Sequence, residues 1–199
     1  MKKLAVILLA VISLTACKQK EKETAKSSVP TYQLDAETVV VNWVGYKFTN
    51  KTGVKGQFQT VEVSSNSEAT NMNEALKGVV FSIPVSSIFS NNGVRDAKLK
   101  SLFFGIMENT ELLSGKVTQI NENAGVISLT MNNETHDLPF TLDVQGKSAY
   151  LKATIDINKW HAEDALASLH KACELLHTGE DGISKTWNTV DIDAVLNFK

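Results

Sequence analysis

The sequence predicts a mainly β fold, in which one antiparallel domain follows a short export signal. Five segments alternate apolar and polar residues with a period of two, as expected for strands that bury one face. Turn-forming clusters rich in Asn and Gly separate these segments, for example at residues 91–93, 121–125 and 145–147. One long segment, residues 161–176, has helical spacing instead. Short strands joined by close turns indicate hairpins in an antiparallel sheet.

Residues 1–16 have the features of a signal peptide. Two lysines follow Met1, an apolar run covers residues 4–12, and small residues precede Cys17. The apolar run is much shorter than the roughly 20 residues that a membrane-spanning helix needs. The Leu-Thr-Ala-Cys sequence at 14–17 also matches the bacterial lipobox, so we expect cleavage before Cys17 and attachment of lipid to its thiol. An ordinary secretory signal with an incidental cysteine is the alternative.

Acylated Cys17 and the residues up to 30 are expected to form a tether between a membrane and the folded domain, which would cover residues 31–199. Residues 18–28 contain no large apolar side chain, so this segment cannot bury a core and should be flexible. Each buried CH₂ contributes about 0.8 kcal/mol, so two or three acyl chains anchor a protein stably. Lys18 stands where some bacteria use an aspartate to retain lipoproteins at the inner membrane. This favours the outer membrane, with either the periplasmic or the surface face left open.

Charge and cysteine content exclude several classes of function. Removal of Lys2 and Lys3 with the signal leaves 18 basic against 22 acidic residues, a formal charge of −4. The chain has no basic stripe interleaved with aromatic residues, so nucleic acid is not expected as a partner. Cys173 is the only cysteine left once Cys17 is acylated, which excludes a disulfide framework.

Each period-two segment places a set of apolar side chains on one face. Six to eight strands of this kind are expected to close into a barrel or a sandwich, because an open sheet leaves unpaired edges. The five sets are Val79, Phe81, Ile83 and Val85; Ile127, Leu129 and Met131; Leu138, Phe140, Leu142 and Val144; Leu151, Ala153, Ile155 and Ile157; and Val190, Ile192, Ala194, Leu196 and Phe198.

The helical segment carries apolar residues three and four positions apart, from Ala162 to Leu176, and Gly179 is a suitable stop. We expect a helix of about four turns that starts near His161 and lies against the sheet or covers one end of it. A shorter helix is expected from Asp96 to Phe104.

Four stretches of the chain, taken in order, resemble the YceI-like family of bacterial exported proteins. They are residues 32–35 with 41–43 (YQLD, VNW), 54–58 (VKGQF), Ile88 with 92–104 (NGVRDAKLKSLFF), and 127–140 (ISLTM through THDLPF). The similarity covers nearly the whole expected domain, so the chain is identified as a lipoprotein member of this family. It departs from the family pattern in three places: Asn133 stands where a glycine is usual, no histidine follows Asp35, and the helix around His170 is an addition.

The resemblance implies a single lipocalin-like antiparallel β-barrel of about eight strands that holds a polyisoprenoid chain in an apolar cavity. A barrel of this size is just wide enough for one slim ligand or for its own side chains, so a packed core without a cavity is the alternative. From the alternation, we expect an isoprenoid lipid, a quinone or another long apolar ligand to contact eight inward-facing residues. These are Trp43, Phe58, Phe81, Ile83, Leu129, Phe140, Leu142 and Ile155.

Arg95 and Asp96 lie between an Asn-Gly turn and the shorter expected helix. Asp96 can cap that helix by accepting hydrogen bonds from backbone N–H groups, and Arg95 can pair with Asp96 or brace the mouth of the barrel. The functional alternative places Arg95 against the polar head group of the ligand.

His170, Cys173 and His177 are three and four residues apart on the expected helix. This spacing places them close together on one face, where they could bind zinc, copper or haem iron with His161 or Glu174 as a fourth ligand. The other interpretation is a buried cysteine beside two histidines at the edge of the apolar face, without a metal.

The sequence therefore predicts a membrane-anchored lipid-binding lipoprotein and not an enzyme. It contains no nucleophile elbow, no glycine-rich phosphate loop and no pair of carboxylates in an apolar setting. No cofactor is required, and an isoprenoid lipid or quinone is the expected bound ligand. A metal- or haem-binding envelope protein is the alternative, and an adaptor for another envelope protein is a third hypothesis. A homodimer is left open.

Overall fold

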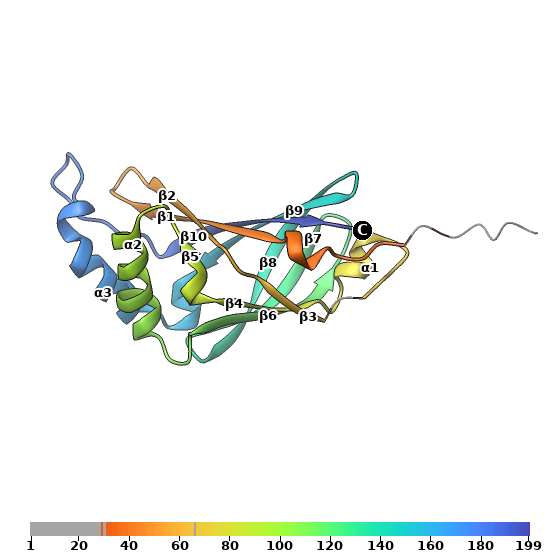
Figure 1. Ribbon diagram of the computed structural model, residues 1–199. Helices are drawn as coiled ribbons and strands as arrows, with labels where there is room; N and C mark the ends of the chain where they lie inside the picture. Colours follow the sequence, from red (N-terminus) through yellow and green to blue (C-terminus); the bar gives the residue numbers. More distant parts are fainter. Residues whose placement is uncertain (1–28, 30, 66) are drawn as a thin grey trace, which may run out of the picture.

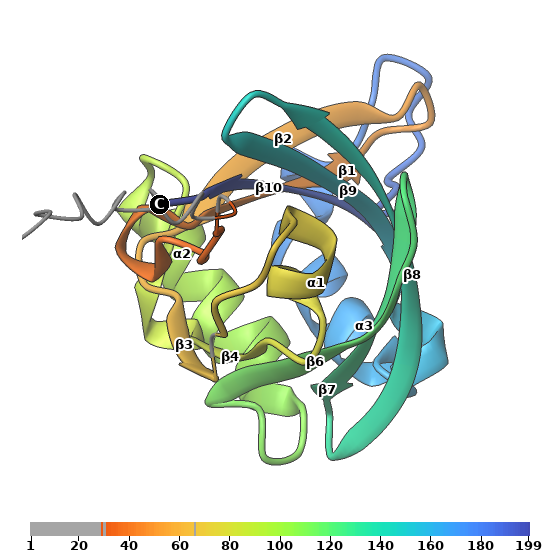
Figure 2. The same ribbon diagram turned by 90° about the vertical axis from the view of Figure 1, so that its right-hand side faces the viewer.

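The computed structural model describes residues 29, 31–65 and 67–199, which form one antiparallel sheet of ten strands curled into a barrel (Figure 1, Figure 2). The strand order is β3-β4-β6-β7-β8-β9-β10-β1-β2-β5. The strands are β1 (Val40–Lys47), β2 (Thr52–Phe58), β3 (Glu62–Ser65), β4 (Val80–Pro84), β5 (Ile88–Phe89), β6 (Leu112–Ile120), β7 (Ala124–Met131), β8 (Glu134–Gln145), β9 (Ser148–Asp156) and β10 (Thr189–Asn197).

Three α-helices and six shorter helical turns connect the strands of the described part. The α-helices are α1 (Met72–Leu76), α2 (Gly93–Lys98) and α3 (Glu163–Cys173). The shorter turns are η1 (Ala36–Thr38), η2 (Val85–Ser87), η3 (Leu99–Phe103), η4 (Phe104–Ile106), η5 (Ile157–Trp160) and η6 (Glu174–Leu176).

The predicted fold class is confirmed, with ten strands in place of about eight. The five period-two segments correspond to β4, β7, β8, β9 and β10. The count is higher because β3 and β5 are short edge segments, of four and two residues. Val144 was expected on the buried face of β8 but is 44% exposed, next to the β8–β9 turn.

The two predicted helices exist with different bounds. α3 begins at Glu163, close to the expected start near His161, and His161 itself adopts a left-handed conformation (φ 47°) that ends η5. It stops at Cys173, so Leu176 falls outside the helix and is 62% exposed. α2 begins at Gly93, before the expected start at Asp96, and the chain continues from it into η3 and η4.

Chain continuity closes the barrel. β2 lies near one end of the sheet order and β3 is the other end, yet residues 59–61 alone connect them. α1 lies across one end of the enclosed space (Figure 2), and α2 and α3 lie at the opposite end (Figure 1). Beneath these helices Trp160 is fully buried, and its indole N–H donates a hydrogen bond to the Leu129 carbonyl (3.1 Å). Buried side chains such as Trp160 therefore fill part of the helical end.

The expected signal peptide, the acylation site Cys17 and nearly all of the expected tether lie outside the described residues. Within the described ranges, no helix combines the length and the apolar character needed to cross a membrane.

Candidate ligand-binding site: an apolar lumen and a basic compartment

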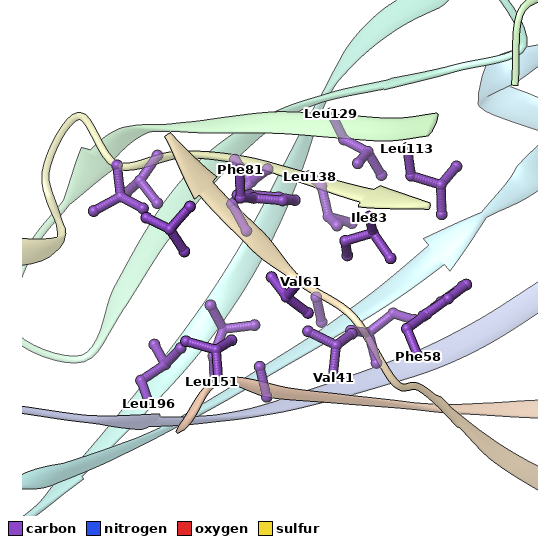
Figure 3. A pocket seen from close by; sticks show the side chains of 18 of the residues that line it. Val41, Phe58, Val61, Phe81, Ile83, Leu113, Leu129, Leu138, Leu151 and Leu196 are labelled. Atoms are coloured by element: carbon purple, nitrogen blue, oxygen red, sulfur yellow. The ribbon is translucent and has the colours of Figure 1, made fainter. Parts of the chain in front are cut away.

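The space enclosed by the strands, here called the lumen, is a cavity of about 130 Å³ lined only by apolar side chains. Figure 3 labels ten of them, from both walls of the barrel, pointing toward one another. Ile83, Leu113 and Leu129 form one side, and Val41 and Phe58 form the other. Since no polar atom faces this cavity, it suits a ligand that needs burial and no hydrogen bonds.

Five of the eight residues predicted for the lumen line it. The other three do not: Trp43 borders a different compartment, and Phe140 and Leu142 are buried outside the cavity lining. The five lining residues are Phe58, Phe81, Ile83, Leu129 and Ile155.

Three aromatic rings lie over glycines on the neighbouring strand, which explains two of these placements. A Cβ at Gly125 would come within 2.3 Å of the Phe140 ring, and one at Gly56 would come within 2.1 Å of the Trp43 ring. Each ring therefore occupies space that a side chain at the glycine would fill; Phe81 still reaches the lumen from this position, while Trp43 and Phe140 do not. The cross-strand pairs are Trp43–Gly56, Phe81–Gly115 and Phe140–Gly125.

β6 contributes lining residues that the sequence analysis missed. Leu113 and Val117 face the lumen from this strand. Leu113, Gly115 and Val117 lie on the same face of β6, but Gly115 has no side chain and Lys116 follows it. The sequence therefore shows no continuous apolar face here. Leu138 and Leu151 also line the lumen. Both belong to apolar faces predicted from the sequence, which could have identified them as lining residues.

The lumen has space for a small group and not for an extended chain in the described conformation. A cavity of about 150 Å³ binds a molecule the size of benzene, and pockets for larger ligands usually measure about 300–1,000 Å³. The 130 Å³ lumen belongs to the first class. A long-chain ligand therefore requires lining side chains to change rotamer.

A second cavity of about 380 Å³, here called the basic compartment, lies between β1, β2, α2 and α3. Its apolar wall includes Trp43, Val54 and Leu99, and its cationic groups are Lys47, Arg95 and Lys98. Trp43 is 7% exposed, and its indole N–H has no hydrogen-bond partner in the described part of the chain. This compartment is thus both apolar and positively charged.

Arg95 lies in the basic compartment and forms no ion pair with Asp96 within the described residues. Asp96 is buried and accepts hydrogen bonds from the Ser90 N–H (2.9 Å) and hydroxyl (2.6 Å). The expected capping by Asp96 is therefore wrong. Asn92 caps α2 instead, with its side-chain oxygen accepting from the Arg95 N–H (3.0 Å).

His170, Cys173 and His177 do not form a metal-binding set. The Nδ1 atoms of His170 and His177 lie 2.9 and 2.6 Å from the Thr186 hydroxyl, while Cys173 Sγ lies 3.8 Å from Lys98 Nζ. A hydroxyl donates only one proton, so at least one of the two histidines donates its Nδ1–H to the Thr186 oxygen. Throughout the described ranges, no three His, Cys, Asp or Glu side chains are grouped so as to hold a metal ion.

His177 is neutral at pH 7. Burial lowers its pKa to about 4, and the positive charges of Lys47, His170 and Lys98 act in the same direction. The expected fourth ligand His161 lies elsewhere, with its Nδ1 2.6 Å from Glu134. The structure thus gives no support to the metal or haem alternative.

Two solved structures share the fold. A "polyisoprenoid binding domain from Saccharophagus degradans implicated in plant cell wall breakdown" aligns with a TM-score of 0.57 and 14% identity, over 84% of this chain and 97% of that one. BcnA of Burkholderia cenocepacia aligns with a TM-score of 0.55 and 13% identity, over 82% and 98%. At these identities the likeness establishes a common architecture.

Sequence comparison assigns the family. A UPF0312 protein of Staphylococcus epidermidis is 34% identical over 95 residues, which are 48% of this chain and 54% of that protein. The chain therefore spans about half the length of the curated relatives it matches. The model of the YceI-like domain matches residues 32–198, nearly all of the folded part. The chain belongs to the YceI-like domain family.

Proposed function

We propose that the protein is a membrane-anchored lipoprotein that binds a long apolar ligand, such as a polyisoprenoid or a quinone-like lipid, in the lumen. The observation that carries this proposal is a cavity between the strands with an entirely apolar lining. Burial stabilises such a ligand by about 0.8 kcal/mol per CH₂ group. The Saccharophagus degradans domain of the same fold, described as polyisoprenoid binding, supports the choice of ligand class.

The protein acts in this proposal by sequestering its ligand and not by chemical catalysis. The lumen presents no nucleophile, acid or base to a bound molecule, because its lining consists of aliphatic and aromatic side chains. Selectivity then follows from length, width and flexibility of the chain. A slim polyprenyl chain meets these limits better than a rigid ring system.

The test uses the mature chain, residues 17–199 with Cys17→Ser, which carries no lipid of its own. We expect a lipid extract of this protein to contain an isoprenoid lipid at near-stoichiometric amount by mass spectrometry, and the emptied protein to take up geranylgeraniol. No copurifying lipid together with no uptake would refute the proposal.

A larger side chain in the lumen should weaken ligand binding. Ala153 lines the cavity and is buried, so Ala153→Leu places additional carbons in it. Excluding two or three methylene groups of ligand should weaken uptake about 10- to 50-fold. Ala167→Leu is the matched control, since Ala167 is exposed on α3. Equal affinities in the two variants would place the ligand outside the lumen.

The anchor is tested separately. We propose that Cys17 is acylated and holds the domain at the outer membrane. Cells fed labelled palmitate should label the wild-type protein in the outer-membrane fraction, and Cys17→Ser should abolish the label. A labelled variant would show that another residue carries the lipid.

A further inference from the structure

The basic compartment has an excess of positive charge that nothing in the described structure balances. Lys47, Arg95 and Lys98 line it, and none of its described lining residues is an aspartate or glutamate. Two carboxylates adjacent in the chain or hydrogen-bonded to lining residues are engaged elsewhere: Asp96 accepts from Ser90, and Asp191 accepts from the hydroxyl of Tyr46. None of the three cations takes part in an ion pair with a described residue.

The cations retain free hydrogen-bond donors. Lys47 Nζ donates to the Leu176 carbonyl (3.2 Å) and Lys98 Nζ to the Ala172 carbonyl (2.9 Å), both near the C-terminal end of α3. These contacts stabilise the helix end, but each ammonium group has three N–H donors. Arg95 adds a planar guanidinium with five donors, a geometry that matches carboxylate and phosphate oxygens.

Two further features of the compartment favour an anion. The indole N–H of buried Trp43 lacks a partner, so a ligand oxygen would satisfy it. The neighbouring lysines that help to keep His177 neutral show that the local potential is positive. Because the wall is also apolar, an anion there is partly shielded from water, which strengthens its attraction to the cations.

The compartment lies directly beside the lumen. On β1, Val41 lines the lumen and Trp43 lines the basic compartment; on β2, Phe58 lines the lumen and Val54 the compartment. Residues two apart on a strand are separated by roughly 6.6 Å. A ligand whose chain occupies the lumen can therefore reach the compartment with its polar end once the side chains between the two cavities move.

We propose that the basic compartment binds the phosphate or carboxylate group of an anionic amphiphile through Lys47, Arg95 and Lys98, while the apolar chain of the same molecule occupies the lumen. This inference rests on the proposed function of the lumen. It adds that the preferred ligand is acidic, and that neutral lipids of the same chain length bind more weakly.

The test compares three probes by calorimetry on the mature chain, residues 17–199 with Cys17→Ser: decyl phosphate, decanol and inorganic phosphate. We expect decyl phosphate to bind at least tenfold more tightly than decanol. Arg95→Gln, which removes no ion pair with another described side chain, should weaken the binding of decyl phosphate three- to tenfold more than the binding of decanol. Arg95→Lys should restore part of the lost preference, and Lys116→Gln, on the outer face of β6, should change nothing.

The outcomes separate the two proposals. If decyl phosphate and decanol bind equally, the anion site is overturned and the lumen proposal stands. The same holds if the preference for decyl phosphate survives unchanged in each of Arg95→Gln, Lys47→Gln and Lys98→Gln. Inorganic phosphate bound as tightly as decyl phosphate would assign the compartment to a free anion and overturn the amphiphile. Failure of all three probes to bind would overturn both proposals.

Discussion

Trp43 shows how a single residue shapes the interior. Its ring occupies the space above Gly56 on the neighbouring strand, and this pair lies between the lumen and the basic compartment. A side chain at position 56 would also come within 2.8 Å of the Phe89 carbonyl oxygen, which is backbone and cannot rotate away. The glycine is therefore required by packing, although its own φ is ordinary.

Gly56→Ala should destabilise the protein by about 1–3 kcal/mol, because the added methyl group overlaps the Trp43 ring. Urea unfolding measures the change. Gly45→Ala is the matched control on β1, where an added Cβ meets nothing within 4 Å. A similar loss in both variants would mean that general strand effects, and not the overlap with Trp43, set the cost.

Acidification should weaken the fold through His177, whose pKa is held at about 4 mainly by burial. An unfolded histidine titrates near pH 6.5, so between about pH 6.5 and 4 the unfolded chain binds a proton that the folded chain does not. Stability conferred by neutral His177 is therefore lost as the pH falls through this window.

His177→Gln should remove this contribution, about 1–2 kcal/mol after allowance for solvent screening. Urea unfolding of the wild type and the variant, at pH 7 and at about pH 4.5, measures how much unfolding free energy each protein loses on acidification. A wild-type protein that loses no more stability than the variant would contradict the assignment.

At the scale of elements, the cap of α2 positions Arg95. The Asn92 side chain accepts a hydrogen bond from the Arg95 backbone N–H, and the helix is only six residues long, so one cap is a large part of its stability. Asn92→Ala should cost about 1 kcal/mol by thermal unfolding, and Asn92→Ser should recover most of it. If alanine and serine give the same melting temperature, the cap has no such role.

The β7–β8 turn explains one departure from the family pattern. Asn132 and Asn133 both have positive φ (52° and 56°), and they connect the paired residues Met131 and Glu134. A two-residue hairpin with this geometry is normally built from asparagine and glycine. Asparagine tolerates the left-handed conformation, so Asn133 can replace the usual glycine without changing the hairpin.

Strands could be predicted where apolar and polar residues alternate without interruption. The bounds of the helices could not be predicted. β7 to β10 carry their period of two in the printed sequence, whereas β6 loses it at Gly115. The start of α3 depends on the backbone conformation of His161, which no apolar pattern records. In the site, alternation identified the inward-facing side chains but not which of them line the cavity and which pack against other side chains. Phe140 and Leu142 face inward and still do not line the lumen.

At the scale of the whole molecule, ligand binding should stabilise the folded state. A ligand present at 100 times its Kd contributes about 2.7 kcal/mol, which for a domain of this size raises Tm by roughly 5–10 °C. Scanning calorimetry with increasing geranylgeraniol measures the shift. Ala153→Leu should show a smaller shift than Ala167→Leu, and a Tm independent of ligand would contradict binding to the folded domain.

The basic compartment was only partly predictable at this scale. Arg95 was singled out from its sequence neighbours as a contact for a ligand head group, and it does lie in the compartment. Lys47 and Lys98 come from a strand and a helix far apart in the chain, and only the fold brings them together with it. Long-range juxtaposition of this kind leaves no local pattern in a sequence.

The link between β2 and β3 has a mechanical consequence. In the described part of the chain no ladder joins β3 directly to β5, but residues 59–61 link β2 to β3 and η2 links β4 to β5. Two β2–β5 pairs, three β3–β4 pairs and a hydrogen bond from the Gln59 N–H to the Ser87 carbonyl (3.0 Å) hold this side of the ring together. Val61 and Val63 face inward there. Widening the ring along this line therefore means breaking these few backbone pairs, whereas each ladder from β6 to β10 holds at least six pairs and keeps the opposite wall rigid.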